Sequence, residues 1–153
     1  MHQLVYEQSR DQFKADVDQS IKCLEDITGK KIKGFRAPGF SITSTTPWAF
    51  ETLLELGIEY DSSVFPASRA HGGFAKFGAA RPIWIECAAG KIKEFPINSS
   101  RIFRKSIIFS GGGYFRILPF WAIERLARKS EYIMTYFHPR DFDLEQPRLK
   151  LSI

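Results

Sequence analysis

Apolar residues near the start of the chain recur with the spacing of an amphipathic helix. The intervals are four, four, three and three residues, which keeps the side chains on one face: Phe13, Val17, Ile21, Leu24 and Ile27. Ser9 is placed to cap the amino end of this helix, with Asp11 adding negative charge in the first turn. Gly29 is a typical end signal. The pattern therefore predicts a helix between Ser9 and Gly29.

Short strand-like and helical patterns then alternate. Residues 32–36 have the pattern of a short strand, and residues 58–60 have that of another. Between them, Thr46-Pro47 is a typical helix start, with the Thr46 hydroxyl as cap and Pro47 at the first helical position, and Gly57 is a typical end. Because strands and helices alternate, we predict βα units, a parallel sheet and an α/β fold.

The second half of the chain begins with an insertion in this pattern. Residues 83–87 and 92–97 flank a glycine-bearing turn and predict a β-hairpin. Residues 101–109 are strand-like, and residues 110–116 form a glycine-rich turn that allows a close backbone approach. Pro119 then opens a third helix.

The run Tyr132–Phe137 is apolar, aromatic and β-branched, and it ends at His138-Pro139. A continuous apolar run of about six residues is typical of a strand buried on both faces of a parallel sheet. His138 would then stand at the carboxyl end of that strand, where α/β folds place their chemistry. The alternative is a histidine that makes one structural hydrogen bond.

Two more polar residues occupy equivalent positions. Arg36 and Asp61 each stand at or just after the end of a predicted strand. If the strands are parallel neighbours, the side chains of Arg36, Asp61 and His138 point into one cleft at the carboxyl ends of the strands. A histidine near an aspartate can act as a general acid, and an arginine can orient a carboxylate or a substrate oxygen.

Composition restricts the class of protein. A chain of 153 residues with 44% apolar residues forms a single globular domain, residues 1–153. The net charge of +5 is spread along the chain, so we expect a solvated basic surface and no nucleic-acid partner. There is no signal peptide or transmembrane segment, which leaves the localisation unknown and the cytoplasm as the default. We expect Cys23 and Cys87 to be buried free thiols, although a disulfide stays open.

Spacing alone does not predict a metal site. A site needs about three protein ligands, and the histidines His2 and His71 belong to no His-x-x-x-His or Cys-x-x-Cys pair. Asp141 and Asp143 could form a paired-carboxylate site. On a polar, proline-containing tail, a solvated turn is the simpler interpretation.

Five ordered segments carry a family resemblance that covers nearly the whole chain. They are residues 34–43 (GFRAPGFSIT), 60–63 (YDSS), 95–96 (FP), 111–116 (GGGYFR) and 137–139 (FHP). Together they resemble the polysaccharide deacetylases, the NodB-homology proteins of carbohydrate esterase family 4. The likeness is greatest to the branch associated with bacterial exopolysaccharide gene clusters, which implies a cell-envelope polysaccharide context.

The resemblance implies a fold and an activity. The fold would be a distorted (β/α)7 barrel, related to TIM barrels, with the β-hairpin as an insertion. The activity would be metal-dependent hydrolysis of a carbon–nitrogen bond, removing acetyl from an N-acetylated polysaccharide with a divalent metal, typically Zn²⁺. By resemblance, His138 protonates the leaving amine, Asp61 keeps that histidine charged, and Arg36 orients the catalytic base. His2 matches a metal-binding histidine of the family.

The resemblance also implies substrate contacts at Pro38, Gly112, Gly113 and Tyr114. The family's Asp-Asp pair and the first histidine of its His-x-x-x-His motif would precede residue 1. A closed barrel also takes roughly 200 residues. We therefore expect an N-terminally truncated, incomplete barrel that is inactive by itself, and a homo-oligomer that covers its exposed edges.

A second class of function stays open. The same fold could serve as a non-catalytic carbohydrate-binding or assembly module, with a cleft lined by aromatic residues: Trp48, Trp84, Trp121 and Tyr114. Such a module would bind saccharide without metal and would tolerate substitution of His138.

Overall fold

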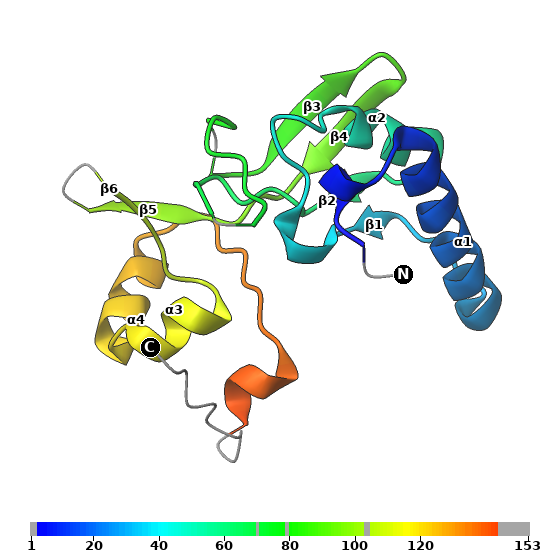
Figure 1. Ribbon diagram of the computed structural model, residues 1–153. Helices are drawn as coiled ribbons and strands as arrows, with labels where there is room; N and C mark the ends of the chain where they lie inside the picture. The colour runs from blue at the N-terminus through cyan, green and yellow to red at the C-terminus, as the bar shows by residue number, and fades with distance from the viewer. Residues whose placement is uncertain (1–2, 70, 79, 103–104, 144–153) are drawn as a thin grey trace, which may run out of the picture.

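The computed structural model describes residues 3–69, 71–78, 80–102 and 105–143 (Figure 1). The helices are α1 (Arg10–Thr28), α2 (Trp48–Glu55), α3 (Gly112–Ile117) and α4 (Phe120–Arg128), with short 3-10 turns η1 (Val5–Glu7), η2 (Pro38–Phe40) and η3 (Pro139–Phe142). The strands are β1 (Gly34–Phe35), β2 (Tyr60–Asp61), β3 (Ile83–Cys87), β4 (Gly90–Glu94), β5 (Ser99–Ile102) and β6 (Lys105–Ile108). No helix in this part of the chain is long and apolar enough to cross a membrane.

The strands form two separate sheets. The larger sheet has the order β1-β2-β4-β3, in which β1, β2 and β4 are parallel and β3 pairs with β4 as an antiparallel hairpin. Strands β5 and β6 form a two-stranded antiparallel sheet, where the sequence indicated one strand. The α/β class, the parallel pairing and the inserted hairpin are therefore confirmed. A closed barrel is not confirmed by the described strands.

Helix α1 has the ends that its sequence predicts. The Ser9 hydroxyl accepts a hydrogen bond from the Gln12 N–H, the Gln12 side chain accepts one from the Ser9 N–H, and Gly29 adopts a left-handed conformation. Phe13 and Val17 are buried in the core, but Ile27 is 74% exposed. The core therefore covers only the first part of the apolar stripe.

Helix α2 packs beside α1 over the large sheet. It begins at Trp48 after Pro47, and the Thr46 hydroxyl accepts from the Thr43 N–H instead of capping the helix, so the predicted cap is wrong. Ala49, Phe50 and Leu53 are buried against the core.

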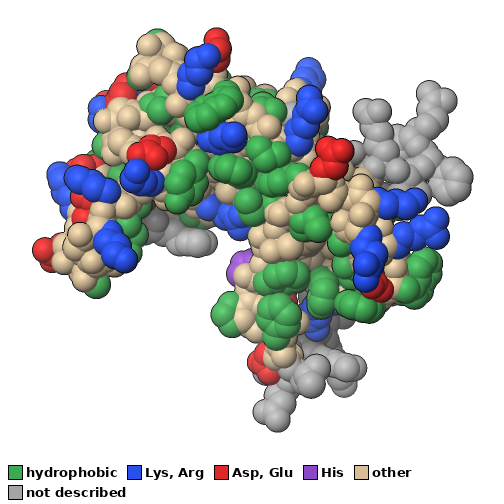
Figure 2. Space-filling view, turned by 180° about the vertical axis from the view of Figure 1, so that it is seen from behind, with side chains coloured by type: hydrophobic (Ala, Val, Ile, Leu, Met, Phe, Trp, Pro, Cys, Tyr) green, Lys and Arg blue, Asp and Glu red, His purple; other side chains and the backbone are tan. Residues whose placement is uncertain are grey.

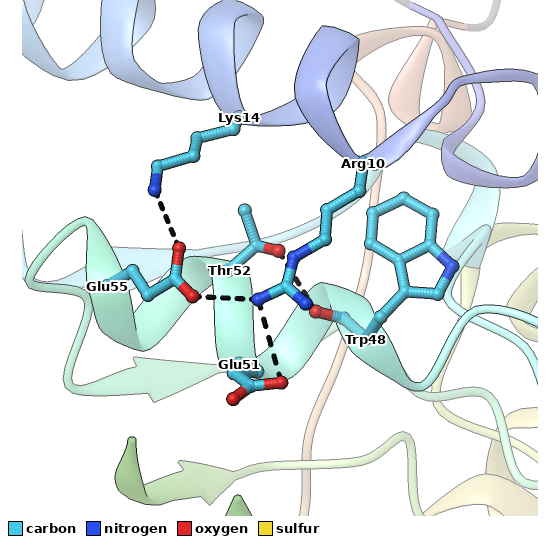
Figure 3. A network of polar contacts seen from close by, with 6 residues as sticks. All are labelled: Arg10, Lys14, Trp48, Glu51, Thr52 and Glu55. Carbon is cyan, nitrogen blue, oxygen red and sulfur yellow. Dashed lines mark hydrogen bonds and ion pairs between the residues drawn. The ribbon is translucent and has the colours of Figure 1, made fainter. Parts of the chain in front are cut away.

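Ion pairs link the exposed sides of the two helices (Figure 3). Arg10 and Lys14 of α1 reach Glu55 of α2 at 2.7 and 2.6 Å, and Arg10 also lies 3.5 Å from Glu51. Because the partners are solvated, the network adds little to the burial that holds α1 on α2.

The run Tyr132–Phe137 is not a strand buried on both faces, so that prediction is wrong. It is an extended segment whose single bridge pairs Tyr136 with Gly111 in parallel. Alternate side chains are half-buried, namely Tyr132, Met134 and Tyr136, whereas those between them are exposed. A strand is buried on both faces only where other elements cover both faces, and here the side chains of Ile133 and Phe137 stay exposed.

Two local expectations also differ from the structure. The glycine-rich segment after Ser110 is not only a turn, because it includes the short helix α3. Both cysteines are free thiols, but Cys23 is exposed because it lies off the buried stripe of α1.

Candidate functional site

Arg36 and Asp61 meet at the carboxyl edge of β1 and β2. Phe35 is the register partner of Asp61, and Arg36 follows it directly. The Arg36 guanidinium donates to the Ser62 carbonyl at 3.1 Å and to the Ser62 hydroxyl at 2.8 Å. Arg36 is therefore fixed to the neighbouring strand end, at the edge where Asp61 lies.

The Asp61 carboxylate lies beneath this edge, fully buried. The Ser63 hydroxyl donates to Oδ1 at 2.6 Å and the Ser63 N–H to Oδ2 at 3.0 Å. The same hydroxyl accepts from the Ala37 N–H at 2.7 Å. One serine thus ties the YDSS segment to the RAPG segment, although they are about twenty-five residues apart.

Glu94 completes a buried acid pair that the sequence analysis missed. It is the register partner of Asp61 on β4, and its side chain is fully buried. The Val64 N–H donates to Oε1 at 3.0 Å, whereas Oε2 has no hydrogen-bond partner among the described residues. Burial and the adjacent negative charge of Asp61 raise the pKa of Glu94 to about 10, and burial also raises the pKa of Asp61.

The two carboxyls therefore hold at least one proton at neutral pH. Asp61 accepts from the Ser63 N–H and hydroxyl, which favour its ionised form, so the proton resides on Glu94. The sequence does contain a signal for Glu94. Alternation along the strand puts it on the same face as Ile92, which is fully buried.

The RAPG segment continues into a backbone of unusual conformation. Gly39 and Phe40 both have positive φ, 61° and 54°. Phe40 is held there by a hydrogen bond from the Gly73 N–H to its carbonyl and by ring contacts with Phe65 and Tyr136. A non-glycine residue in this region is strained, and such residues cluster at functional sites.

His138 lies beside a different carboxylate from the predicted one. Its side chain is 61% exposed, and Nδ1 is 3.7 Å from Oδ2 of Asp141. The His138 N–H donates to the same oxygen at 2.8 Å. The structure therefore does not bring His138 to the buried Asp61. Asp141 is also not a solvated turn residue, since its side chain is only 11% exposed.

Gly111 and Gly112 are placed against residues 136–141. The Gly112 N–H donates to the Tyr136 carbonyl at 3.1 Å, and a Cβ at Gly112 would collide with the Asp141 carboxylate. Gly113 faces open space, and Tyr114 is 38% exposed. Gly112 thus lets α3 start directly against Asp141, next to His138.

An open groove of about 690 Å³ runs past Arg36. Besides Arg36, its walls include Tyr60, Ser62, Phe95 and Met134. Pro38 is half-buried and does not line this groove.

The described residues do not assemble a metal site. No three His, Cys, Asp or Glu side chains within the described ranges are grouped so that they could hold an ion. His2, the ligand that the resemblance implies, lies outside the described residues.

The predicted aromatic cleft does not form as a single feature. Trp48 packs against Phe13, with ring centroids 5.7 Å apart, and belongs to the core. Trp84 and Trp121 are exposed, but Trp84 lies on strand β3 and Trp121 on helix α4.

The fold and site define a class of protein: an α/β chain with an arginine and a buried acid pair at the carboxyl edge of parallel strands. The chain belongs to the family described as "Domain of unknown function (DUF3473)", whose profile matches residues 62–153. This domain is found in polysaccharide deacetylase-like proteins, so the resemblance that the motifs indicate is confirmed.

One solved structure is similar to the chain: "Crystal structure of putative polysaccharide deacetylase from Mycobacterium smegmatis". The identity is 23% and the TM-score 0.49, over 63% of this chain. The match spans 29% of the length of that protein. No curated protein matches the chain.

Proposed function

We propose that this chain contributes to a hydrolase that removes N-acetyl groups from a bacterial exopolysaccharide. The observation that carries the proposal is the pair His138–Asp141, held against Gly112 within the part of the chain that the family profile matches. The occurrence of this domain in polysaccharide deacetylase-like proteins and the order of the five motifs support it.

In the proposed reaction, the exposed His138 imidazole donates a proton to the departing sugar amine. Amide hydrolysis needs such a donor because an unprotonated amine leaves poorly, and a histidine has a suitable pKa range for the task. The Asp141 carboxylate, 3.7 Å away, pairs with the imidazolium and orients it. Gly113 and Tyr114, on the same turn, would contact the sugar.

Arg36 and the acid pair have a supporting role in this proposal. Asp61 and Glu94 are buried beneath the strand ends, and Arg36 above them presents its guanidinium to the groove. We assign Asp61 to electrostatic support of the site at a distance, since Asp141 is the carboxylate beside His138.

We also propose a divalent metal, Zn²⁺ by resemblance, and a (β/α) barrel for the gene product that carries this chain. The donors in the described part of the chain do not fit a metal, so no step above passes through one. His2 stays a proposed ligand.

The test is deacetylation of an N-acetylated polysaccharide by the gene product, measured with and without added Zn²⁺. We expect His138→Ala to abolish acetate release. The matched control is His71→Ala, at another exposed histidine, which should leave acetate release unchanged. Full activity of His138→Ala contradicts the proposed role of His138. Absence of acetate release and of metal binding in the unmodified gene product contradicts the hydrolase.

Saccharide binding without metal, unaffected by His138→Ala, would instead establish the non-catalytic module. We also propose a homo-oligomer that covers the exposed sheet edges. Light scattering tests it, and a monodisperse monomer contradicts it.

A further inference from the structure

Helix α4 and the end of α3 present large apolar side chains to solvent. Ile117 is 80% exposed, Phe120 71% and Trp121 68%, the highest values among the large apolar residues apart from Ile27. We call Ile117, Phe120 and Trp121 the α4 patch. No residue of α4 is fully buried. Three large apolar side chains exposed within residues 117–121 favour a docking surface.

The α4 patch is not the side by which the helix packs on the protein. Ala122, Ile123, Leu126 and Ala127 are half-buried and provide that side. These residues therefore anchor the helix, and the α4 patch stays exposed near its amino-terminal end.

Cations lie beside Trp121 of the α4 patch. A hollow of about 370 Å³ is lined by Trp121, Arg125, Arg128, Lys129 and one acid, Glu124. Glu124 is paired with Arg128 at 2.9 Å. Figure 2 shows Lys and Arg side chains gathered beside hydrophobic ones over the part of the molecule that carries α3 and α4.

The cations of this hollow differ in pairing from five lysines on α1 and around the large sheet. Those five have acidic partners: Lys14, Lys22, Lys31, Lys33 and Lys91. In the hollow, Arg125 and Lys129 have no acidic partner in the described ranges. Two uncompensated cations beside an exposed tryptophan favour an anionic occupant.

We propose that the α4 patch and the adjoining cationic hollow dock the protein on an anionic phospholipid membrane. Phe120 and Trp121 would enter the interface between head groups and acyl chains, where aromatic rings are most favourable. The cations of the hollow would contact lipid phosphates, and each cation would add to the free energy of binding. The proposal does not depend on the hydrolase activity.

A second copy of the chain fits this surface less well. In a two-fold symmetric contact the same patch faces itself, so Arg125 and Lys129 of both copies would approach one another. That contact would bring like charges together with a single acid per copy, already paired.

The test is co-sedimentation of the full chain with vesicles of phosphatidylcholine, and of phosphatidylcholine with about 30% phosphatidylglycerol. We expect roughly twenty-five-fold tighter binding to the anionic vesicles, since two uncompensated cations each add about a factor of five. The preference should fall as salt is raised, because surface charges are screened.

Variants assign the binding to this surface. We expect Phe120→Ser with Trp121→Ser to abolish vesicle binding, and Arg125→Glu with Lys129→Glu to remove the anionic preference. The matched control is Trp84→Ser with Lys93→Glu, an exposed tryptophan with a lysine 4.9 Å above its ring on the hairpin. The control should bind like the unmodified chain, and circular dichroism should show all three variants folded.

Three results would overturn the proposal. One is equal binding to neutral and anionic vesicles. Another is a dimer, seen by light scattering, that Phe120→Ser with Trp121→Ser dissociates while vesicles go unbound. The third is a loss of vesicle binding in the hairpin control as large as in the α4 variants.

Discussion

Asp61 and Glu94 lie opposite each other on adjacent parallel strands, and neither carboxyl is accessible to solvent. Together with Ser63 they form a buried polar cluster at the edge where Arg36 emerges. Because one carboxyl must stay protonated to be tolerated there, the cluster links protonation to folding.

Stability should fall as pH rises through the neutral range. The pKa of Glu94 is about 10 in the folded protein against an ordinary value of 4.5, so the folded state keeps a proton that the unfolded state releases. The stabilisation from that proton is complete below pH 4.5 and is lost toward pH 10. We expect a slope of at most about 1.4 kcal/mol per pH unit in the free energy of unfolding, measured with urea.

Glu94→Gln isolates this effect, because glutamine does not titrate and keeps the shape. Its free energy of unfolding should vary less with pH than that of the unmodified protein, and the difference should favour the variant increasingly at high pH. Parallel pH profiles of the two proteins would show that Glu94 does not carry the shifted proton.

Ser63→Ala should destabilise the fold by about 2 kcal/mol. The substitution removes the donor to Asp61 and the acceptor of the Ala37 N–H, both in buried surroundings. Thermal and urea unfolding measure the loss. Ser68→Ala, at an exposed position, should change stability by less than about 0.5 kcal/mol, and equal losses in both variants would refute the network.

Gly112→Ala and Gly113→Ala should have opposite effects. A methyl at Gly112 collides with the Asp141 carboxylate, which overpacking data suggest costs about 1–3 kcal/mol. A methyl at Gly113 meets nothing within 4 Å and lies in α3, so it should be neutral or stabilise by about 0.5 kcal/mol. If both variants unfold at the same urea concentration, the Gly112–Asp141 contact is wrong.

Ser9→Ala tests the start of α1. Losing the hydroxyl that accepts from the Gln12 N–H should cost about 1 kcal/mol in the free energy of unfolding. Ser20→Ala is the control. The Ser20 hydroxyl donates only to the Asp16 carbonyl within the helix, and alanine is the better helix former. A loss in Ser20→Ala as large as in Ser9→Ala would contradict a specific cap.

Asp141→Asn tests the positioning of His138 in the proposed reaction. The amide oxygen can still accept from the His138 N–H, but the charge beside the imidazole is lost. We expect deacetylation by the gene product to fall at least about tenfold, with a shifted pH profile. Asp143→Asn, at an exposed neighbouring position, should leave both unchanged. An unchanged pH profile in Asp141→Asn would limit Asp141 to a structural role.

The elements that the sequence predicted well are those set by local chemistry. The α1 ends follow from Ser9 and Gly29, and the hairpin of β3 and β4 follows from two alternating segments around a glycine-bearing turn. Arg36 and Asp61 could be paired because residues at the carboxyl ends of parallel strands meet at one edge. The first two inferences used spacing or conformational preference within a few residues, and the third used a general property of parallel sheets.

The predictions that failed depended on neighbours that local patterns do not specify. An apolar run such as Tyr132–Phe137 is buried on both faces only if other elements cover both faces, and here Ile133 and Phe137 stay exposed. His138 was assigned to Asp61, but the turn at Pro139–Phe142 brings Asp141 back to it instead. Alternation with Ile92 indicates that Glu94 is buried, but its pairing with Asp61 was missed because it depends on which strand lies beside β4.

In the sequence by itself, ordered motifs carried the family resemblance. The α/β class and the positions of the main helices and the hairpin were also determined there, because turn geometry and periodicity are encoded locally. Only the tertiary structure decided which carboxylate accompanies His138, that Glu94 shares a buried edge with Asp61, and that α4 presents aromatic residues and cations to solvent. Those outcomes depend on which side chains the fold brings close together and which it leaves exposed, and the sequence pattern does not specify the distances between remote segments.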